Sequence, residues 1–393
     1  MTLNLYDYHT DPTQLLYYDR VEFIHNDLFF RNNDGNIVVP GDLDLAFTEI
    51  TELPDGLKAD RLKVGGRLNL RRTKITQLPD GLEVGSDLDL ESTKITQLPT
   101  GLKVGRNLDL GMTKITQLPA DLEVGGGLNL GFTKITRLPD GLKVSGFLDL
   151  RRTPITQLPD GLKVSGDLNL RFTPITELPT GLKVGGRLDL ESTKITQLPD
   201  GLEVGGDLNL QGTKITRLPD NLKVGGFLGL KGTPITQLPD GLEVGGSLIL
   251  LGTPITHLPK GLKVSGDLDL SYSKITELPD DLEVGGNLDL RHTPITELTT
   301  GLKVSGDLWL NKVKITQLPD GLEVGGYLDL RDTPITQLPA GLKVGRSLDL
   351  SYSKITHLPD DLEIGDSLFI DNTPITQLPD NLEVGGEIIG FKG

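Results

Sequence analysis

The sequence of 393 residues predicts a β-rich solenoid, in which about seventeen near-identical coils of 20 residues stack on one another. A single phrase, L-x-V-G-G-x-L-x-L-x-x-T-x-I-T-x-L-P-x-G, fits the chain from Ile37 onward and is broken only by a five-residue insertion in "GLKADRLKVGG". Within a copy, Leu88-Asp89-Leu90 alternates with the period of two that is typical of a half-buried strand. Leu82-Glu83-Val84 forms a second, shorter alternation, so each coil is expected to contain two short strands.

The corners of the coil are predicted from glycine and proline. Gly85 and its equivalents separate the two alternations and are expected to form a sharp bend between them, and Pro99 with Gly101 marks the other corner. A coil of this size cannot cover its own apolar face, so like strands of successive coils are expected to pair in parallel and to bury leucine, valine and isoleucine in one core.

The sequence divides into three parts. Residues 1–36 are not repetitive and are expected to form an N-terminal cap, with a helix start at Asp11-Pro12 and a hairpin turn at Asp34-Gly35. A small functional domain is the alternative for this segment. Residues 37–386 hold the repeats, and residues 387–393 form a C-terminal end with little capping material.

The amino-acid composition disfavours some classes of function and excludes some kinds of site. The chain has 39 basic and 55 acidic side chains, a net charge of -16, which favours solubility or a basic partner and disfavours direct binding to nucleic acid or to an anionic membrane. It has no cysteine, so disulfides and thiolate metal sites are excluded. Neither a signal peptide nor a stretch of about 18 apolar residues is present, which predicts a cytoplasmic protein or one exported without a Sec-type signal.

The core pattern Leu88-x-Leu90-x-x-Thr93-x-Ile95-x-x-Leu98-Pro99 resembles the leucine-rich repeat, and is closest to the short bacterial type with an LP signature that is found in effector proteins. The resemblance covers residues 37–393. It implies a right-handed curved coil, with a parallel sheet on the concave face and another protein held on that sheet. It also implies that the chain acts by binding and is not an enzyme.

The repeats depart from that family at two positions. The family's asparagine, which bonds the backbone of adjacent turns, is replaced by Thr93 and its equivalents, and by Val313 in one copy. A threonine hydroxyl can make part of such a ladder, whereas Val313 cannot. The family's earlier leucine is replaced by Gly85. Both changes leave a parallel β-helix open as the alternative architecture.

Alternation predicts that the column through Asp89 faces solvent on the principal sheet. The column holds nine Asp, four Asn and four exceptions, namely Asp44, Asn69, Asp89, Asp109, Asn129, Asp149, Asn169, Asp189, Asn209, Gly229, Ile249, Asp269, Asp289, Trp309, Asp329, Asp349 and Phe369. A solvated face, an acidic track for a basic partner and a ladder of cation sites are three interpretations of this column.

The exceptions predict where a partner would bind. The neighbouring copies with Phe227, Ile249 and Leu251 place an apolar patch on the acidic sheet, and exposed apolar patches mark contact sites. Trp, Tyr and Arg dominate binding energy at interfaces. The predicted binding residues are Trp309, Tyr327, Arg331, Phe227, Ile249, Leu251, Asp269 and Asp289, with random drift of the repeats as the alternative explanation.

Catalytic signals are weak throughout. His257 and His357 share a column but stand five coils apart, and acid pairs such as Asp267 and Asp269 are expected by chance in so acidic a chain. The glycines lack the spacing of a phosphate loop. The sequence therefore predicts no catalytic residue, no metal ligand and no cofactor.

The predicted function is a non-enzymatic protein-interaction scaffold that binds a protein partner on its acidic concave sheet, and whether that partner is basic stays open. Three alternatives remain: an acidic mimic of nucleic acid that inhibits a DNA- or RNA-binding protein, a β-helical carbohydrate-active enzyme, and an ice-binding solenoid that uses the exposed column of Thr96. No direct nucleic-acid or membrane binding is predicted, and the oligomeric state is unknown.

Overall fold

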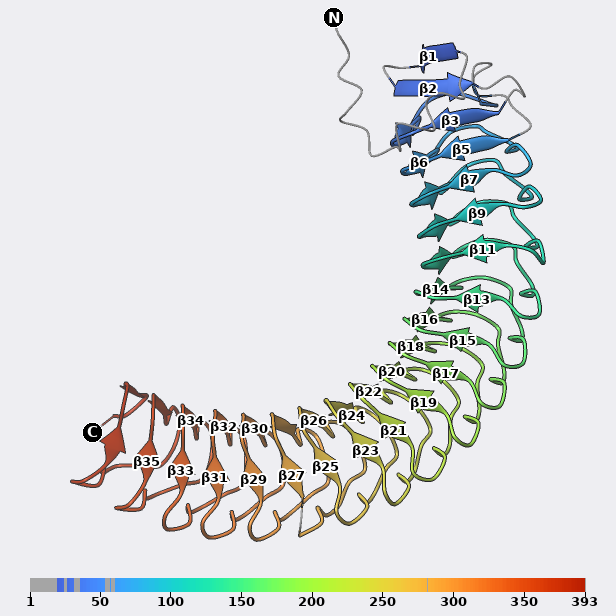
Figure 1. Cartoon of the computed structure of the whole chain (residues 1–393). Coiled ribbons are helices and arrows are strands. Elements are labelled where there is room, and N and C mark those ends of the chain that lie inside the picture. Colours follow the sequence, from blue (N-terminus) through green and yellow to red (C-terminus); the bar gives the residue numbers. More distant parts are fainter. Residues whose placement is uncertain are drawn as a thin grey trace, which may run out of the picture. The chain divides into compact units, whose positions relative to one another are not determined.

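The computed structural model describes residues 20–24, 27–31, 36–53, 57, 61–280 and 282–392. The chain forms two compact units, residues 1–189 and 190–393, called unit 1 and unit 2 below. In both units the described residues form short β-strands joined by turns, which confirms the predicted β-rich solenoid (Figure 1). Within these ranges no helix has the length and apolar content that crossing a membrane would require.

Each coil contributes one strand to each of two sheets, which we call the leucine sheet and the valine sheet. In unit 1 the leucine sheet contains β4 (Leu43–Asp44), β6 (Leu68–Asn69), β8 (Leu88–Asp89), β10 (Leu108–Asp109), β12 (Leu128–Asn129), β14 (Leu148–Asp149), β16 (Leu168–Asn169) and β18 (Leu188–Asp189). The valine sheet of unit 1 contains β3 (Ile37–Val39), β5 (Leu62–Val64), β7 (Glu83–Val84), β9 (Lys103–Val104), β11 (Glu123–Val124), β13 (Lys143–Val144), β15 (Lys163–Val164) and β17 (Lys183–Val184). It consists of two parts, because the strand pairing is interrupted between β11 and β13.

Unit 2 repeats the same arrangement. Its leucine sheet contains β20 (Leu208–Asn209), β22 (Leu228–Gly229), β24 (Leu248–Ile249), β26 (Leu268–Asp269), β28 (Leu288–Asp289), β30 (Leu308–Trp309), β32 (Leu328–Asp329), β34 (Leu348–Asp349), β36 (Leu368–Phe369) and β38 (Ile388–Ile389). Its valine sheet contains β19 (Glu203–Val204), β21 (Lys223–Val224), β23 (Glu243–Val244), β25 (Lys263–Val264), β27 (Glu283–Val284), β29 (Lys303–Val304), β31 (Glu323–Val324), β33 (Lys343–Val344), β35 (Glu363–Ile364) and β37 (Glu383–Val384).

Like strands pair in parallel and in identical register. Leu108 lies opposite Leu128 and Asp109 opposite Asn129, so each residue meets its own equivalent one repeat later. The same register holds along the leucine sheet of unit 2, where Leu288 lies opposite Leu308. Every outward column of the sequence is therefore also a column in space.

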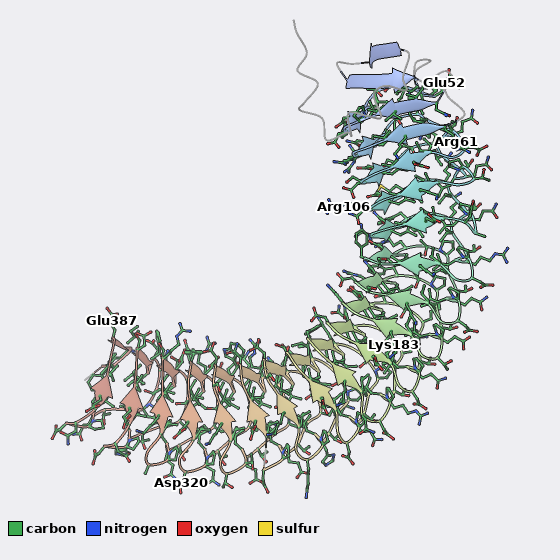
Figure 2. All side chains as sticks on the ribbon, viewed as in Figure 1. Glu52, Arg61, Arg106, Lys183, Asp320 and Glu387 are labelled. Carbon is green, nitrogen blue, oxygen red and sulfur yellow. The ribbon has the colours of Figure 1, made fainter. Side chains whose placement is uncertain are left out.

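The core consists of ladders of identical side chains. Leu90 and Ile95 are completely buried, and Val84 and Leu88 are nearly so. Burying one such side chain stabilises the fold by about 1.5–3 kcal/mol, and the contacts come from the coils on either side. Polar side chains project outward instead, as Arg61 and Arg106 do in unit 1 (Figure 2).

Two antiparallel strands precede the first repeat. β1 (Arg20–Ile24) pairs with β2 (Asp27–Arg31), and β2 pairs with β3 so that Arg31 lies opposite Ile37. This pairing agrees with the hairpin expected from the sequence, although its turn at Asp34-Gly35 lies outside the described residues, as does the expected helix start at Asp11-Pro12. β1 and β2 thus occupy the edge of the valine sheet next to β3.

The threonine column does not form a ladder between coils. The buried Oγ1 of Thr93 donates to the carbonyl of Leu90 at 2.8 Å, and Thr293 bonds Leu290 in the same way at 2.6 Å. The hydroxyl therefore closes a turn within its own coil. Val313 loses only this bond, because its backbone N–H still donates to Leu310 at 2.9 Å.

Glycine serves two different purposes at the corners. Gly101 has a φ of +66°, as expected for the corner next to Pro99. The chain bends at Gly85 between the two strands, as predicted, although Gly85 has no positive φ. A Cβ at Gly85 would lie 2.1 Å from the carbonyl oxygen of Gly65, so close contact between coils leaves little room for a side chain, and the larger residue found at this position in other coils is serine, as at Ser145 and Ser165.

Candidate functional site

The Asp and Asn side chains of the leucine sheet are built into the corner that follows each strand. The Oδ1 of Asp89 accepts a hydrogen bond from the backbone N–H of Glu91, two residues later, at 3.1 Å. The same bond recurs at Asn129 with Gly131 and at Asp269 with Ser271, both at 2.9 Å. This local bond turns the chain away from the strand, so the column has a structural role that either residue type fills.

Several of these carboxylates are buried, which contradicts the prediction that the whole column faces solvent. Asp289 is 4% exposed and Asp329 is 1% exposed. In both coils an arginine two residues later folds back over the acid: the Nη2 of Arg291 lies 2.6 Å from Asp289 Oδ2, and the Nη2 of Arg331 lies 2.7 Å from Asp329 Oδ2. The negative charge at these positions is compensated within the coil.

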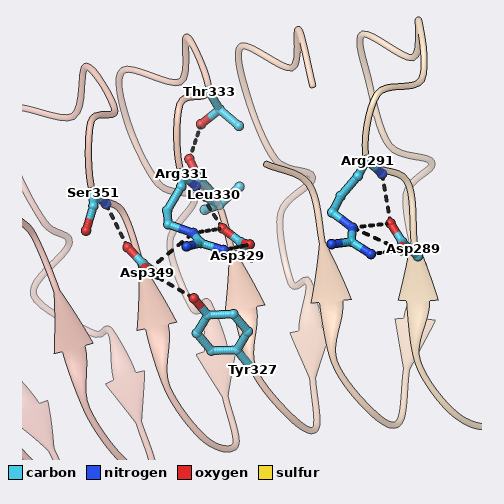
Figure 3. A network of polar contacts seen from close by, with 9 residues as sticks. All are labelled: Asp289, Arg291, Tyr327, Asp329, Leu330, Arg331, Thr333, Asp349 and Ser351. Carbon is cyan, nitrogen blue, oxygen red and sulfur yellow. Dashed lines mark hydrogen bonds and ion pairs between the residues drawn. The ribbon is translucent and has the colours of Figure 1, made fainter. Parts of the chain in front are cut away.

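Tyr327 extends this network across neighbouring coils (Figure 3). Its hydroxyl donates to Asp349 Oδ2 at 3.0 Å, and the Nε of Arg331 lies 3.5 Å from the same oxygen. Burial raises the pKa of the Tyr327 hydroxyl well above its ordinary value, and the carboxylates of Asp329 and Asp349 raise it further. The hydrogen bonds that Arg331 donates to Asp329 raise the pKa of Arg331. Tyr327 therefore stays a neutral donor and Arg331 stays charged.

Trp309 lies on β30, between the Asp289 and Asp329 positions of the two adjacent strands. The guanidinium carbon of Arg291 stands 5.6 Å from the centre of the indole ring, within the range of a cation–π contact. Trp309 is partly exposed, while the two acids beside it are buried. The indole is thus held in place by its neighbours and still reaches solvent.

The apolar residues lie together on β22 and β24. Gly229 pairs with Ile249, and Phe227 stands on the same outward face, two residues before Gly229. A Cβ on Gly229 would lie 2.6 Å from the Cζ atom of Phe227, so the ring occupies the space that a side chain at Gly229 would need. Phe227, Ile249 and Leu251 are all partly exposed, and the glycine is explained by the ring that covers it.

All eight predicted binding residues lie on the leucine sheet of unit 2 or directly beside its strands. Asp269 on β26 stands between the two groups, next to Ile249 on one side and Asp289 on the other. Of the eight residues, Asp289 alone is buried. It holds Arg291 in place and exposes little surface that a partner could contact. The remaining seven are partly or fully exposed.

The other polar candidates have local partners. His257 Nδ1 lies 2.8 Å from the Thr256 hydroxyl, and Asp267 Oδ1 accepts the N–H of Asn287 at 2.8 Å. In unit 1, ligand atoms of Asp89, Glu91 and Asp109 lie within 4.8 Å of one another. Arg67 pairs with Asp89 and Arg71 with Glu91, so this acidic cluster already contains its own cations.

Sequence reasoning missed one column of exposed side chains, three residues after the Asp89 column, which we call the corner column. Its residues have φ values near +60°, including Phe132 (62°), Phe172 (59°) and Tyr272 (57°). The spacing of hydrophobic residues in the sequence carries no information about the backbone angle φ. The signal that was available is the choice of residue, since the same column holds glycine at Gly212, Gly232 and Gly252.

No family model matches the sequence, and no curated protein matches it. Among solved structures, the chain is similar to YopM from Yersinia enterocolitica, with a TM-score of 0.46, 19% identity and coverage of 88% of this chain and 91% of that chain. It is also similar to YopM, a leucine-rich effector protein from Yersinia pestis, with a TM-score of 0.48, 19% identity and coverage of 89% and 88%. A leucine-rich-repeat protein of Leptospira interrogans gives a TM-score of 0.34, 20% identity and coverage of 88% and 90%.

These similarities transfer no functional residue to this chain. Its architecture follows from its own repeat phrase, its two short strands per coil and its ladders of buried leucine. On these grounds the chain is a β-rich solenoid with leucine-rich-repeat-like coils, each of which contains two short strands.

Proposed function

We propose that the chain is a non-enzymatic protein-interaction scaffold, and that it holds a protein partner on the leucine sheet of unit 2. The observation that carries the proposal is the grouping of the residues that depart from the repeat. Phe227, Ile249, Leu251, Trp309 and Tyr327 lie on one sheet and are partly exposed. Folding alone gives no reason to place large apolar side chains on the outer face of a sheet, whereas binding does.

The rigidity of this surface supports the same proposal. Tyr327 is fixed by its hydrogen bond to Asp349, and Trp309 lies against Arg291, so both aromatic rings are held before a partner arrives. A surface that is already ordered loses little conformational entropy on binding. Backbone hydrogen bonds along the parallel strands hold the positions of these residues relative to one another.

Charge indicates the kind of partner. Residues 190–393 contain 17 Lys or Arg and 29 Asp or Glu, so unit 2 is strongly acidic. The acids nearest the aromatic residues are paired with Arg291 and Arg331, so they contribute little to the negative electrostatic potential of unit 2. The partner that fits is a protein with an apolar contact surface and basic residues around it, because long-range charge speeds the encounter and apolar contacts hold the complex.

Substitution of the apolar residues tests the proposal. Trp309→Ala and the pair Ile249→Asp/Leu251→Asp are each expected to weaken capture of partner proteins by more than about fivefold, which corresponds to roughly 1 kcal/mol. The measurement compares the proteins that the parent and each variant retain from one lysate, followed by titration of the retained protein. Circular dichroism should be the same for parent and variants.

Two controls separate contact from charge. Asp269→Asn should reduce affinity less, and that reduction should shrink with added salt, as expected for an exposed charge. Thr96→Ala, on the exposed threonine column of unit 1, should leave capture unchanged. If the Trp309 and Ile249/Leu251 variants bind like the parent, the exceptions in the repeat are drift and the proposal is wrong.

A further inference from the structure

The corner column of unit 1 carries large side chains at a backbone conformation that disfavours them. From the first coil onward its residues are Phe47, Arg72, Ser92, Met112, Phe132, Arg152 and Phe172, with φ values between 55° and 62°. A left-handed conformation costs roughly 1 kcal/mol or more at a residue with a Cβ. The glycines at 212, 232 and 252 show that a corner of this kind forms without any side chain.

These side chains also stay outside the core. Phe132 is 43% exposed and Phe172 is 41% exposed, so the rings bury only part of their apolar surface. Phe147, on the strand side of the same region, is 39% exposed and lies over Gly127, where a Cβ would come within 2.2 Å of its ring. The left-handed conformation recurs at this column in most coils, and at Phe132 and Phe172 it coincides with an exposed apolar ring.

Arginines occupy the spaces around these rings. The guanidinium carbon of Arg152 lies 4.5 Å from the centre of Phe172 and 5.7 Å from that of Phe132. Arg151 stands 5.7 Å from Phe132 and Arg171 stands 5.5 Å from Phe172. We call the five residues Phe132, Arg151, Arg152, Arg171 and Phe172 the Phe–Arg surface. Ring contact restrains the arginines while their side chains remain partly in solvent. The Nε atoms of Arg151 and Arg171 also face carboxylates of the chain itself, Asp149 at 3.2 Å and Asp189 at 3.8 Å.

The charge of these coils differs from that of the rest of the chain. Residues 61–189 contain 19 Lys or Arg and 14 Asp or Glu, in a protein whose net charge is -16. The valine sheet shows the same bias, because the usual alternation of Lys and Glu gives way to three adjacent lysines, with Lys143 opposite Lys163 and Lys163 opposite Lys183. Like charges placed side by side destabilise a sheet, so this is another cost without a folding benefit.

We propose that the Phe–Arg surface binds an acidic segment of a second protein, in which carboxylates alternate with apolar side chains. A guanidinium pairs with a carboxylate through two parallel N–H···O bonds, and the exposed rings offer apolar contact beside them. Single-stranded nucleic acid fits less well. Base binding requires open ring faces for stacking, and here the guanidinium groups of Arg151, Arg152 and Arg171 lie against those faces.

The test uses the full chain and a fluorescein-labelled peptide of about twelve residues in which Glu and Leu alternate. Fluorescence anisotropy is expected to show binding by the parent that weakens as salt is added. Arg151→Ala/Arg152→Asn should lower the affinity at least tenfold, because it removes two of the three guanidinium groups. Arg137→Ala is the matched control: it removes one positive charge from the exposed side of a neighbouring coil and should change the affinity less than twofold.

A second variant separates binding from folding. Phe132→Asn/Phe172→Asn puts at the corner a residue type that tolerates a left-handed φ, as Asn372 does in unit 2. The melting temperature should stay the same or rise, while peptide affinity falls at least fivefold. A purely structural role for the two rings would give the opposite result, with lower stability and unchanged binding, and would overturn the proposal.

Four further outcomes would also overturn it. The parent could fail to bind the acidic peptide, or bind a Lys-for-Glu version of it equally well. A uridine oligonucleotide of similar length could bind more tightly and be lost in the same variants, which would assign the surface to nucleic acid. Sedimentation could reveal oligomers that the variants abolish, which would make a second copy of this chain the occupant.

Discussion

Deletion of residues 1–36 is expected to make the protein aggregate or to lower its melting temperature sharply. β2 pairs with β3 through Phe30 and Arg31, so removing β1 and β2 leaves the edge of β3 without its hydrogen-bond partner. It also removes the only described strands on the outer side of the Ile37 coil, and Ile37 is fully buried in the intact chain. Open strand edges recruit other chains, and a solenoid without its terminal cap is poorly soluble.

Size-exclusion chromatography and thermal unfolding measure this effect. A matched control deletes residues 1–19 alone, which keeps both strands and should preserve the monomer fraction. We propose on this basis that residues 1–36 act as a cap. A monomeric protein of unchanged melting temperature after the longer deletion would mean that the segment does not cap the solenoid and has another role.

Arg331→Ala is expected to destabilise unit 2 by about 2 kcal/mol. The change removes the hydrogen bonds from Nε and Nη2 of Arg331 to Asp329 and leaves a carboxylate that is 1% exposed without its cation. Loss of one partner from a fully buried ion pair costs about 3–5 kcal/mol. The smaller value applies here because 46% of the Arg331 side chain is exposed, so water can reach the acid.

Chemical denaturation checks the size of this loss. The double variant Asp329→Asn/Arg331→Ala should recover much of the stability, because the amide carries no charge and asparagine fills the same position at Asn169 and Asn209. Lys263→Ala, which removes an exposed ion pair with Glu283, should have no measurable effect. Equal losses for Arg331→Ala and the double variant would show that the buried charge is not the cause.

The fold was predictable because the same 20-residue repeat determines the strands, the corners and the core of every coil. The spacing of Leu88, Leu90 and Ile95 repeats without a slip after Leu68, and identical coils have one simple way to bury identical side chains. The pattern also predicted correctly that Phe227, Ile249 and Trp309 would stay partly exposed, since alternation places them on the outer face.

Alternation does not report how deeply an outward residue is buried. Asp289 and Asp329 occupy outward positions, yet they are covered by Arg291 and Arg331 from the same coil. The arginine two residues after each acid was visible in the sequence, but the Oδ1 bond that bends the chain and brings the two side chains together depends on backbone geometry. The strained corner column stayed hidden for the same reason, because apolar periodicity contains no information about φ.

Hydroxyl-radical footprinting of the complex with a captured partner tests the central claim most directly, because it measures how accessible each side chain is to solvent. The proposed function predicts lower oxidation of Trp309, Tyr327 and Phe227 in the complex than in the free protein. Tyr272, exposed on the corner column of unit 2, should react equally in both states. Unchanged oxidation of Trp309 and Phe227, with protection confined to residues near the valine sheet, would contradict the proposal that the partner binds on the leucine sheet.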